Sequence, residues 1–296
     1  MQHTRRLMLH IVAALATVIV ATPASAAFPE RPIKIIVDYK AGAGGTVGAD
    51  FVAKSPADGY TLMLANTGVM VINPAIYPKL TYATLKDFVP IARTAQQPLA
   101  LIVNTSLPVN SVQELVAMAK KAPGKLNYGS AGNGGSSHLV PEMFKQATGT
   151  FIVHIPYRGS APALTDLLAG QVQMMAESIP LASQYVKQGK LRALAITGRE
   201  RNAALPGVPT FAEAGIKGMD VVGFYGVMAP AGTPKDVVAR LSEAFKQVLD
   251  NPELRKSMTA QGADPAYLNS EQFGAYLVAE MPVWAKAVKD SGAKLD

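Results

Sequence analysis

The chain has 296 residues, with 28 Lys and Arg against 21 Asp and Glu, a formal net charge of +7 and no cysteine. The basic excess is spread along the sequence without a Lys/Arg cluster or interleaved aromatic residues, so it argues against nucleic-acid binding and favours anionic ligands only weakly. The absence of cysteine excludes disulfides, thiol nucleophiles and thiolate metal sites. A chain of this length can bury one or two hydrophobic cores.

Residues 1–26 have the pattern of an export signal peptide. Arg5 and Arg6 supply a positive start, residues 7–20 are mostly apolar, and Ala24-Ser25-Ala26 matches the small-x-small cleavage pattern. A transmembrane helix is the alternative, but the apolar run is short for one. The paired arginines also leave a twin-arginine export route open beside general secretion. We therefore expect a secreted, periplasmic protein.

After this segment the sequence predicts strands and helices in alternation. Residues 33–37 form a continuous apolar run typical of a buried parallel strand, and residues 60–65 form a second strand that ends in Asn66 and Thr67. Polar residues in that place line binding sites beyond the carboxyl ends of strands. The alternation predicts an α/β fold with largely parallel sheets, and an apolar run at 221–229 is long enough to pass from one domain to another. Further strands are expected at 88–93, 99–103, 151–155, 171–176 and 191–197, and helices at 111–121, 139–148, 160–170, 180–187, 234–249 and 270–290.

The stretch from Lys125 to Leu139 combines a short strand, a glycine-rich loop and the start of a helix. Its glycines permit positive φ angles and let a ligand approach the backbone. Ser136 and Ser137 directly precede the helical pattern and are predicted to cap the helix. Because the first N–H groups of a helix lack internal partners, such a start can bind an anion without a metal. The alternative interpretation is a surface turn followed by an ordinary cap.

A second helix start of the same design follows at residues 156–162, where Ser160 is the predicted cap. Successive units of one sheet place their helix starts at its carboxyl edge, so the two starts are expected to converge and hold a carboxylate. Two routine turns of an α/β sheet are the alternative. Glu177 ends the next predicted strand, where it either accepts a hydrogen bond from a ligand's ammonium or hydroxyl group or faces solvent.

Other kinds of chemistry find little support in the sequence. Gly132 and Gly134 begin a dinucleotide-like fingerprint, but its third glycine and the acidic residue about twenty positions later are absent. There is no Gly-x-Ser-x-Gly elbow and no cluster with metal-ligand spacing. His138 and His154 are expected to cap or pack. We therefore expect no enzyme activity, no catalytic residue, no metal site and no cofactor.

Six motifs carry a family resemblance. They are Pro-Ala-Asp-Gly-Tyr-Thr-Leu (56–62), Asn-Tyr-Gly-Ser-Ala-Gly-Asn-Gly (127–134), Pro-Tyr-Arg-Gly-Ser-Ala-Pro-Ala-Leu (156–164), Gly-Gln-Val-Gln-Met-Met (170–175), Leu-Pro-Gly-Val-Pro-Thr (205–210) and Ala-Pro-Ala-Gly-Thr-Pro (229–234). With these motifs the chain closely resembles, over essentially all its length after residue 26, the periplasmic solute receptors of tripartite tricarboxylate transporters, the Bug receptors. The resemblance implies a two-lobed periplasmic-binding-protein (Venus-flytrap) fold that closes around a small carboxylate and delivers it to membrane permease subunits.

The resemblance also implies a ligand site made of backbone N–H groups, small hydroxyl side chains and bridging waters. Lobe 1 is expected to contain residues 27–98 and 228–296 and lobe 2 residues 99–227, with crossing segments near these boundaries acting as a hinge. The expected partners are a small organic anion and the permease, without nucleic acid, and the protein is expected to be a monomer. The implied ligand-binding residues are Asn66 and Thr67 on lobe 1, Ser130, Gly132, Ser136, Ser137, Gly159 and Ser160 on lobe 2, and Glu177 as a specificity position.

One departure from the family pattern concerns the first lobe. In the family, the first strand leads through a Pro/Gly-rich loop and a helix to a second strand, which ends in a Gly-Ala-Gly-Gly loop. Here residues 33–37 run directly into Asp38-Tyr39-Lys40 and the glycines of 41–45. We therefore hypothesise that a βα unit of roughly thirty residues is missing, and with it one wall of the pocket. A non-binding remnant of such a receptor and, less favoured, an exported hydrolase are the alternative functions.

Overall fold

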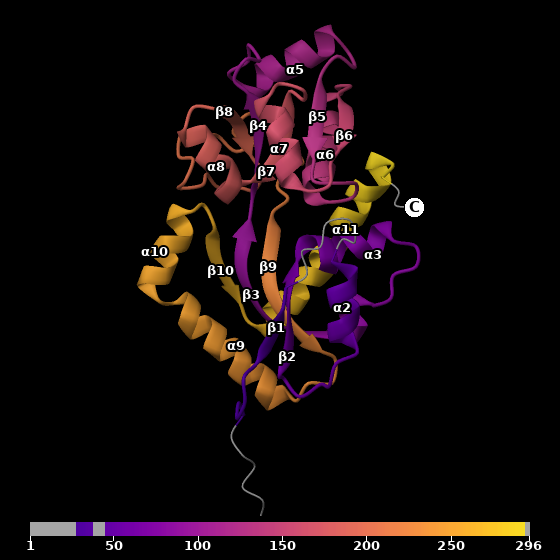
Figure 1. Ribbon diagram of the computed structural model, residues 1–296, viewed down its shortest axis with the longest axis vertical. Coiled ribbons are helices and arrows are strands. Elements are labelled where there is room, and N and C mark those ends of the chain that lie inside the picture. The colour runs from indigo at the N-terminus through magenta and orange to yellow at the C-terminus, as the bar shows by residue number, and fades with distance from the viewer. Residues whose placement is uncertain (1–27, 38–44, 294–296) are drawn as a thin grey trace, which may run out of the picture. The chain divides into compact units, whose positions relative to one another are not determined.

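The computed structural model describes residues 28–37 and 45–293 and divides into two compact units, Met1–Pro32 and Ile33–Asp296. Residues 28–32 of the first unit form no helix or strand, and the second unit holds the elements that follow (Figure 1). The predicted export signal lies outside the described residues, as does most of the joint at which the family pattern is broken. Among the described helices, none combines the length and the apolar character needed to span a bilayer.

The first sheet has five strands in the order β1-β2-β9-β3-β10. β1 and β2 are parallel, and the other neighbouring pairs are antiparallel. The central strand β9 is buried over nearly all its length, as its run of apolar and small residues predicts. The strands are β1 Lys34–Ile36, β2 Thr61–Asn66, β9 Gly223–Pro230, β3 Phe88–Gln97 and β10 Asp264–Leu268. The helices in this part of the chain are α2 Thr46–Ala53, η1 Gly68–Ile72, α3 Asn73–Ile76, α4 Thr84–Asp87, α9 Lys235–Leu249, α10 Pro252–Ala260 and α11 Ser270–Ser291.

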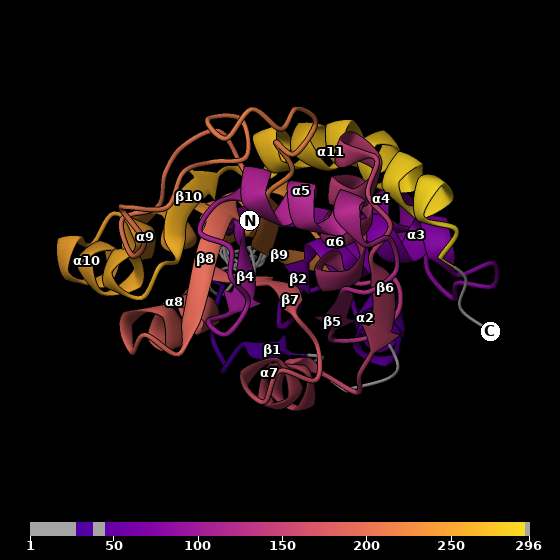
Figure 2. The ribbon, with the colours of Figure 1, turned by 90° about the horizontal axis from the view of Figure 1, so that it is seen from above.

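The second sheet has five strands in the order β6-β5-β7-β4-β8. Figure 2 shows α5 and α6 on one side of this sheet and α7 on the other. The strands are β6 Val153–Pro156, β5 Asn127–Ser130, β7 Met174–Ser178, β4 Leu99–Asn104 and β8 Leu191–Ile196. The helices are α5 Val112–Lys121, α6 Ser136–Thr148, α7 Ser160–Leu168 and α8 Ile179–Lys187.

Both sheets are mixed, and the prediction of largely parallel sheets was wrong in this respect. The parallel pairs are β1 with β2, β5 with β6 and β5 with β7. The antiparallel pairs all involve β3, β4 or β9, strands next to the points where the chain passes between sheets. β3 continues through Pro98 into β4, so β4 enters the second sheet against the direction of β7. The α/β class itself is confirmed.

Side chains of the second sheet alternate between two apolar clusters, as the pleat of a strand requires. On β7, Met174 and Ala176 belong to the cluster that contains Phe144 of α6, whereas Met175 belongs to the cluster that contains Leu164 of α7. The sheet is therefore covered by helices on both faces. This packing holds the carboxyl ends of β5, β6 and β7 at one common edge.

Two segments connect the sheets. One is the direct junction of β3 and β4, and the other is the stretch 197–222 between β8 and β9. The apolar run that we expected to cross between domains is mostly β9, which belongs wholly to the first sheet because it pairs with β2 and β3. The lobe boundaries and the hinge remain predictions.

Candidate functional site

Two loops meet at the carboxyl edge of the second sheet, where β5 and β6 end side by side. The Tyr157 N–H donates to the Ser130 carbonyl at 3.0 Å, and the Gly159 N–H donates to the Ala131 carbonyl at 3.0 Å. These bonds join the loop before α6 to the loop before α7. The expected convergence of the two helix starts is therefore present in the structure.

Both helices begin on a glycine, and the prediction that serines cap them was wrong. The N-cap of α6 is Gly135 and that of α7 is Gly159, and neither helix start has a side-chain cap. Ser136 and Ser160 are instead the first helical residues, one position further along than a cap. Because a glycine cap brings no side-chain acceptor, the first two N–H groups of each helix keep their capacity to bind an anion. The third position adds none, since the His138 N–H donates to the Gly135 carbonyl at 2.9 Å and Pro162 has no N–H.

Positive φ angles explain two of the glycines in these loops. Gly132 has φ 138° and Gly159 has φ 111°, in a region that residues with a Cβ rarely adopt. A Cβ at Gly159 would meet no atom within 4 Å, so the requirement there is conformational and not a matter of space. Both positions were among the expected ligand-binding residues, and the structure assigns them a role in shaping the loops.

Ser130 and Ser137 stabilise the first loop through their hydroxyl groups. Ser137 Oγ accepts from the Ala131 N–H at 3.0 Å, and Ser130 Oγ accepts from the Gly132 N–H at 3.2 Å. Ser130 Oγ also donates to the Gly132 carbonyl at 3.0 Å and lies 2.6 Å from Nε2 of His154. No described hydrogen bond uses the hydroxyl proton of Ser137, whereas Ser130 is fully buried with its hydroxyl already occupied.

A stack of aromatic rings lies beneath this loop. The His138 and His154 ring centroids are 4.0 Å apart with an interplanar angle of 8°, and Tyr128 stacks on His154 at 4.7 Å. His138 Nδ1 accepts from the Gly134 N–H at 3.0 Å. The rings therefore connect the loop to β5 and β6, and the expected packing role of both histidines agrees with this geometry.

Burial keeps both histidines neutral. Loss of solvent, followed by the neighbouring His138 and Lys145, lowers the pKa of His154 to about 3. Loss of solvent also lowers the pKa of His138, against the opposing effect of Glu142. Glu142 accepts from the Tyr128 hydroxyl at 2.5 Å and pairs with Lys145 at 2.6 Å. Neutral imidazoles can serve as the hydrogen-bond acceptors and donors that the loop requires.

Glu177 ends β7 at the same edge of the sheet. Its side chain is buried, with 7% exposed, so the solvent-facing alternative was wrong. Oε1 accepts from the Ser178 N–H at 2.7 Å, while Oε2 is buried and has no hydrogen-bond partner among the described residues.

Asn66 and Thr67 organise the end of β2 in the first sheet. Thr67 is buried, and its Oγ1 accepts from the Phe224 N–H at 2.7 Å. Asn66 Oδ1 accepts from the Val69 N–H at 3.1 Å. The described contacts hold these side chains against their own sheet and do not join them to the loops of the second sheet. Their role in ligand binding remains a prediction.

Sequence reasoning missed several residues of this site. The hydrogen bond between Tyr128 and Glu142 joins β5 to α6, and the bond between Gly134 and His138 joins the loop to α6. The only signal in the sequence was the pair of histidines beside the two glycine loops, and we interpreted it as packing alone.

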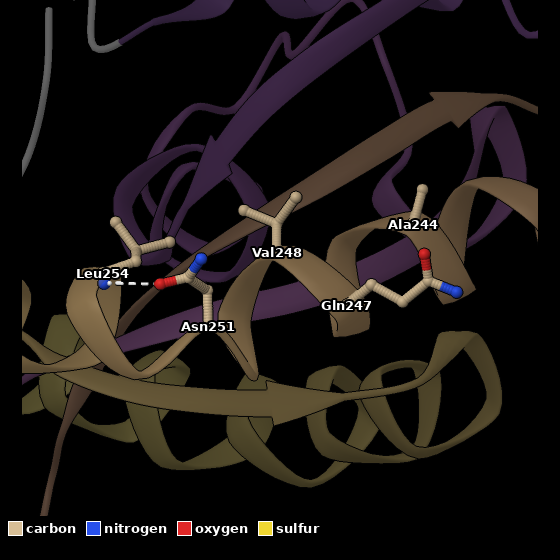
Figure 3. A pocket seen from close by; sticks show the side chains of 5 residues that line it. All are labelled: Ala244, Gln247, Val248, Asn251 and Leu254. Carbon is tan, nitrogen blue, oxygen red and sulfur yellow. Dashed lines mark hydrogen bonds between the residues drawn. The ribbon is translucent and has the colours of Figure 1, made fainter.

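The structure also contains a pocket of about 460 Å³ on α9 and α10, away from these loops in the sequence. Figure 3 shows it lined by Ala244, Gln247, Val248, Asn251 and Leu254. No charged side chain lines it, and the Asn251 side chain already accepts from the Leu254 N–H at 3.1 Å as the cap of α10. Its lining thus offers little to hold a carboxylate.

The two mixed sheets and their helices match two solved structures, a periplasmic transporter and the periplasmic binding protein BugD, with TM-scores of 0.83 and 0.79, and so form an α/β periplasmic-binding-protein fold. Residues 30–292 match the tripartite tricarboxylate transporter family receptor, so the chain belongs to this family of periplasmic solute-binding proteins. This confirms the resemblance found in the sequence.

Similar proteins support the assignment. Protein BugT of Bordetella pertussis (strain Tohama I) is 34% identical over 321 aligned positions that cover 98% of each chain. The R. palustris protein Rpa4515, solved with adipate, is 30% identical with a TM-score of 0.82, over 90% of this chain and 99% of that one. MatC from Rhodopseudomonas palustris, solved with bound malate, is 29% identical with a TM-score of 0.77, over 88% and 100% of the two chains.

The region of the hypothesised missing unit is flanked by exposed apolar side chains. Ile35 of β1 and the adjacent Val37 are 46% and 58% exposed, and Val47 and Phe51 of α2 are 64% and 52% exposed. The BugT alignment spans 321 positions, more than the 296 residues of this chain, so it contains gaps in this chain. Neither observation places a gap at this joint, which falls mostly outside the described residues, so the missing segment remains a hypothesis.

Proposed function

We propose that this protein captures a small organic carboxylate in the periplasm and delivers it to the permease of a tripartite tricarboxylate-type transporter. The observation that carries the proposal is the junction of two glycine-capped helix starts, held together by the two backbone hydrogen bonds between their loops. Family membership and the adipate and malate bound by structural relatives support the same ligand class.

In this proposal the ligand carboxylate accepts hydrogen bonds from N–H groups in the first turns of α6 and α7. The partial positive charge of each helix start favours the anion, and the donors are fixed before the ligand arrives. Ser136, Ser137 and Ser160 lie in those first turns and add hydroxyl donors. Asn66 and Thr67 would complete the site on closure, which is the state that a permease would recognise.

An exported hydrolase is a weaker candidate even though Ser130 lies within hydrogen-bond distance of a histidine. Ser130 is fully buried, so a substrate has no access to its hydroxyl. With a pKa near 3, His154 would also be a poor base at neutral pH. No turnover of chromogenic esters is expected.

Equilibrium dialysis of the full chain against labelled succinate, malate, adipate and citrate tests the proposal. Saturable retention of at least one of these anions, at one equivalent per chain, is the expected result. Retention of none of them would favour the alternative of a folded but non-binding remnant, and transport would then be withdrawn as the function of this chain.

A further inference from the structure

His138, the third residue of α6, holds the glycine loop that precedes this helix. Its Nδ1 accepts from the Gly134 N–H at 3.0 Å in a buried hydrogen bond. Its own N–H donates to the carbonyl of the N-cap residue Gly135 at 2.9 Å. The side chain and the backbone of one residue therefore fix the last two loop positions before the helix.

The N–H groups of the loop and the helix start fall into two sets. Those of Ala131, Gly132 and Gly134 each bind a side-chain acceptor. The next three N–H groups along the chain, those of residues 135–137, take part in no hydrogen bond among the described residues. Gly134 directly precedes this unbonded set and has φ 76°, in the left-handed region. The orientation of the unbonded N–H groups thus depends on what holds Gly134 in that conformation.

The bond to Gly134 requires one tautomer of the His138 ring. Because Nδ1 accepts, it carries no proton, and the single ring proton of the neutral imidazole lies on Nε2. The other tautomer and the imidazolium form both carry a proton on Nδ1 and could not accept this bond. Without it the buried Gly134 N–H would lose its acceptor, which favours a different loop conformation.

We propose that His138 is a positioning residue of the anion site, which holds Gly134 through Nδ1 and so orients the unbonded N–H groups for a carboxylate. This inference rests on the proposed function and adds a side chain that sets the affinity of the site without touching the ligand. Donors that are already in place cost less free energy to order on binding. If only a fraction of the molecules holds the competent loop, the apparent dissociation constant rises by the inverse of that fraction.

Packing of the ring is the competing explanation, since His138 stacks on His154 with 4.0 Å between the centroids. Two substitutions separate the acceptor from the ring. His138→Asn removes the ring but keeps an acceptor, because the amide oxygen of asparagine is bonded to Cγ as Nδ1 is. His138→Phe keeps a ring and removes the acceptor.

Calorimetric titration of the full chain and both variants with succinate, malate, adipate and citrate tests the inference. For each anion that the unmodified chain binds, we expect His138→Asn to retain the affinity within about threefold. We expect His138→Phe to lose about tenfold or more. The control Asn251→Ala removes another side-chain acceptor of backbone N–H groups, at the cap of α10, and should leave the affinity unchanged.

Nuclear magnetic resonance of the unmodified protein decides if either variant fails to fold, judged by its thermal unfolding. The ¹⁵N signals of the His138 ring should show Nδ1 without a proton. Because ligand binding and the bond to Gly134 stabilise each other in this proposal, a saturating anion should slow hydrogen exchange of the Gly134 amide. We expect the slowing to exceed that of the Leu254 amide, which Asn251 binds, by at least about fivefold.

The outcomes separate this inference from the proposed function. Retained affinity in His138→Phe, equal losses in the two variants, a protonated Nδ1 or equal slowing at the two amides overturns the positioning role and leaves carboxylate binding in place. Failure of the unmodified chain to bind any of the four anions overturns both.

Discussion

Ser137 offers the most direct test of the anion site. Two serine hydroxyls, of Ser130 and Ser137, bond within the loop, and only that of Ser137 acts solely as an acceptor there, which leaves its proton for the ligand. The substitution Ser137→Ala removes the acceptor of the Ala131 N–H and the donor to a bound carboxylate. Ser137 is buried, with 8% exposed, so water replaces these bonds poorly. A hydrogen bond to a charged group contributes about 1.5–3 kcal/mol, which corresponds to a loss of affinity of about ten- to a hundredfold.

The same substitution has a smaller effect on stability. The lost bond between Ala131 and Ser137 is neutral, so we expect the free energy of unfolding without ligand to fall by about 1 kcal/mol. Calorimetric titration and thermal unfolding of the variant measure the two effects separately. The matched control is Ser257→Ala, at an exposed position of α10, which should change neither.

Unchanged affinity in Ser137→Ala would contradict the reasoning, since it would place the ligand away from the start of α6. A large loss of stability with unchanged affinity would also contradict it, because Ser137 would then act only within the loop.

Three further predictions concern the loop, the histidine stack and the region around α2. Gly159→Ala forces a residue with a Cβ into φ 111°, so we expect the unfolding free energy to fall by about 1–3 kcal/mol and ligand binding to weaken. Chemical denaturation measures the first effect, and unchanged values would show that α7 can begin with another backbone conformation. The pKa of His154 is about 3 in the folded chain against an ordinary value of 6.5, so the unfolded chain binds more protons between these values. Stability should therefore fall as the pH decreases from about 6.5 to about 3, and His154→Gln should flatten this part of the profile measured by denaturant titration; an equal slope in the variant would assign the effect to other groups. Replacing the exposed Val47 and Phe51 by serine should reduce light scattering on storage with little change in melting temperature, whereas a marked drop in melting temperature would mean that these side chains are packed in solution.

The sequence predicted the parts of the site that depend on local spacing. The glycine loops at 129–135 and 157–159 and the helices after them are where the patterns placed them, because turn glycines and helical periodicity are local properties. The serine caps were wrong because a glycine can take the cap position, and spacing alone does not distinguish a cap from a first helical residue.

Long-range features were beyond the reach of these patterns. The strand β10 was missed since its five half-buried residues, with a proline among them, resemble a loop. The burial of Glu177 follows from β4 and α7 packing around the end of β7, and the stack of His138 on His154 follows from β6 lying beside β5. Neither neighbour is adjacent in the sequence, so propensity and spacing could not predict these contacts.

The central claim is that the folded chain binds a small carboxylate, and thermal unfolding of the full chain with and without a panel of mono-, di- and tricarboxylates tests it most directly. A ligand that binds only the folded state at a hundred times its dissociation constant adds about 2.7 kcal/mol of stability. For a chain of this size the account predicts a rise in melting temperature of about 5 °C or more with at least one compound. A cooperative transition that no carboxylate shifts would contradict the account.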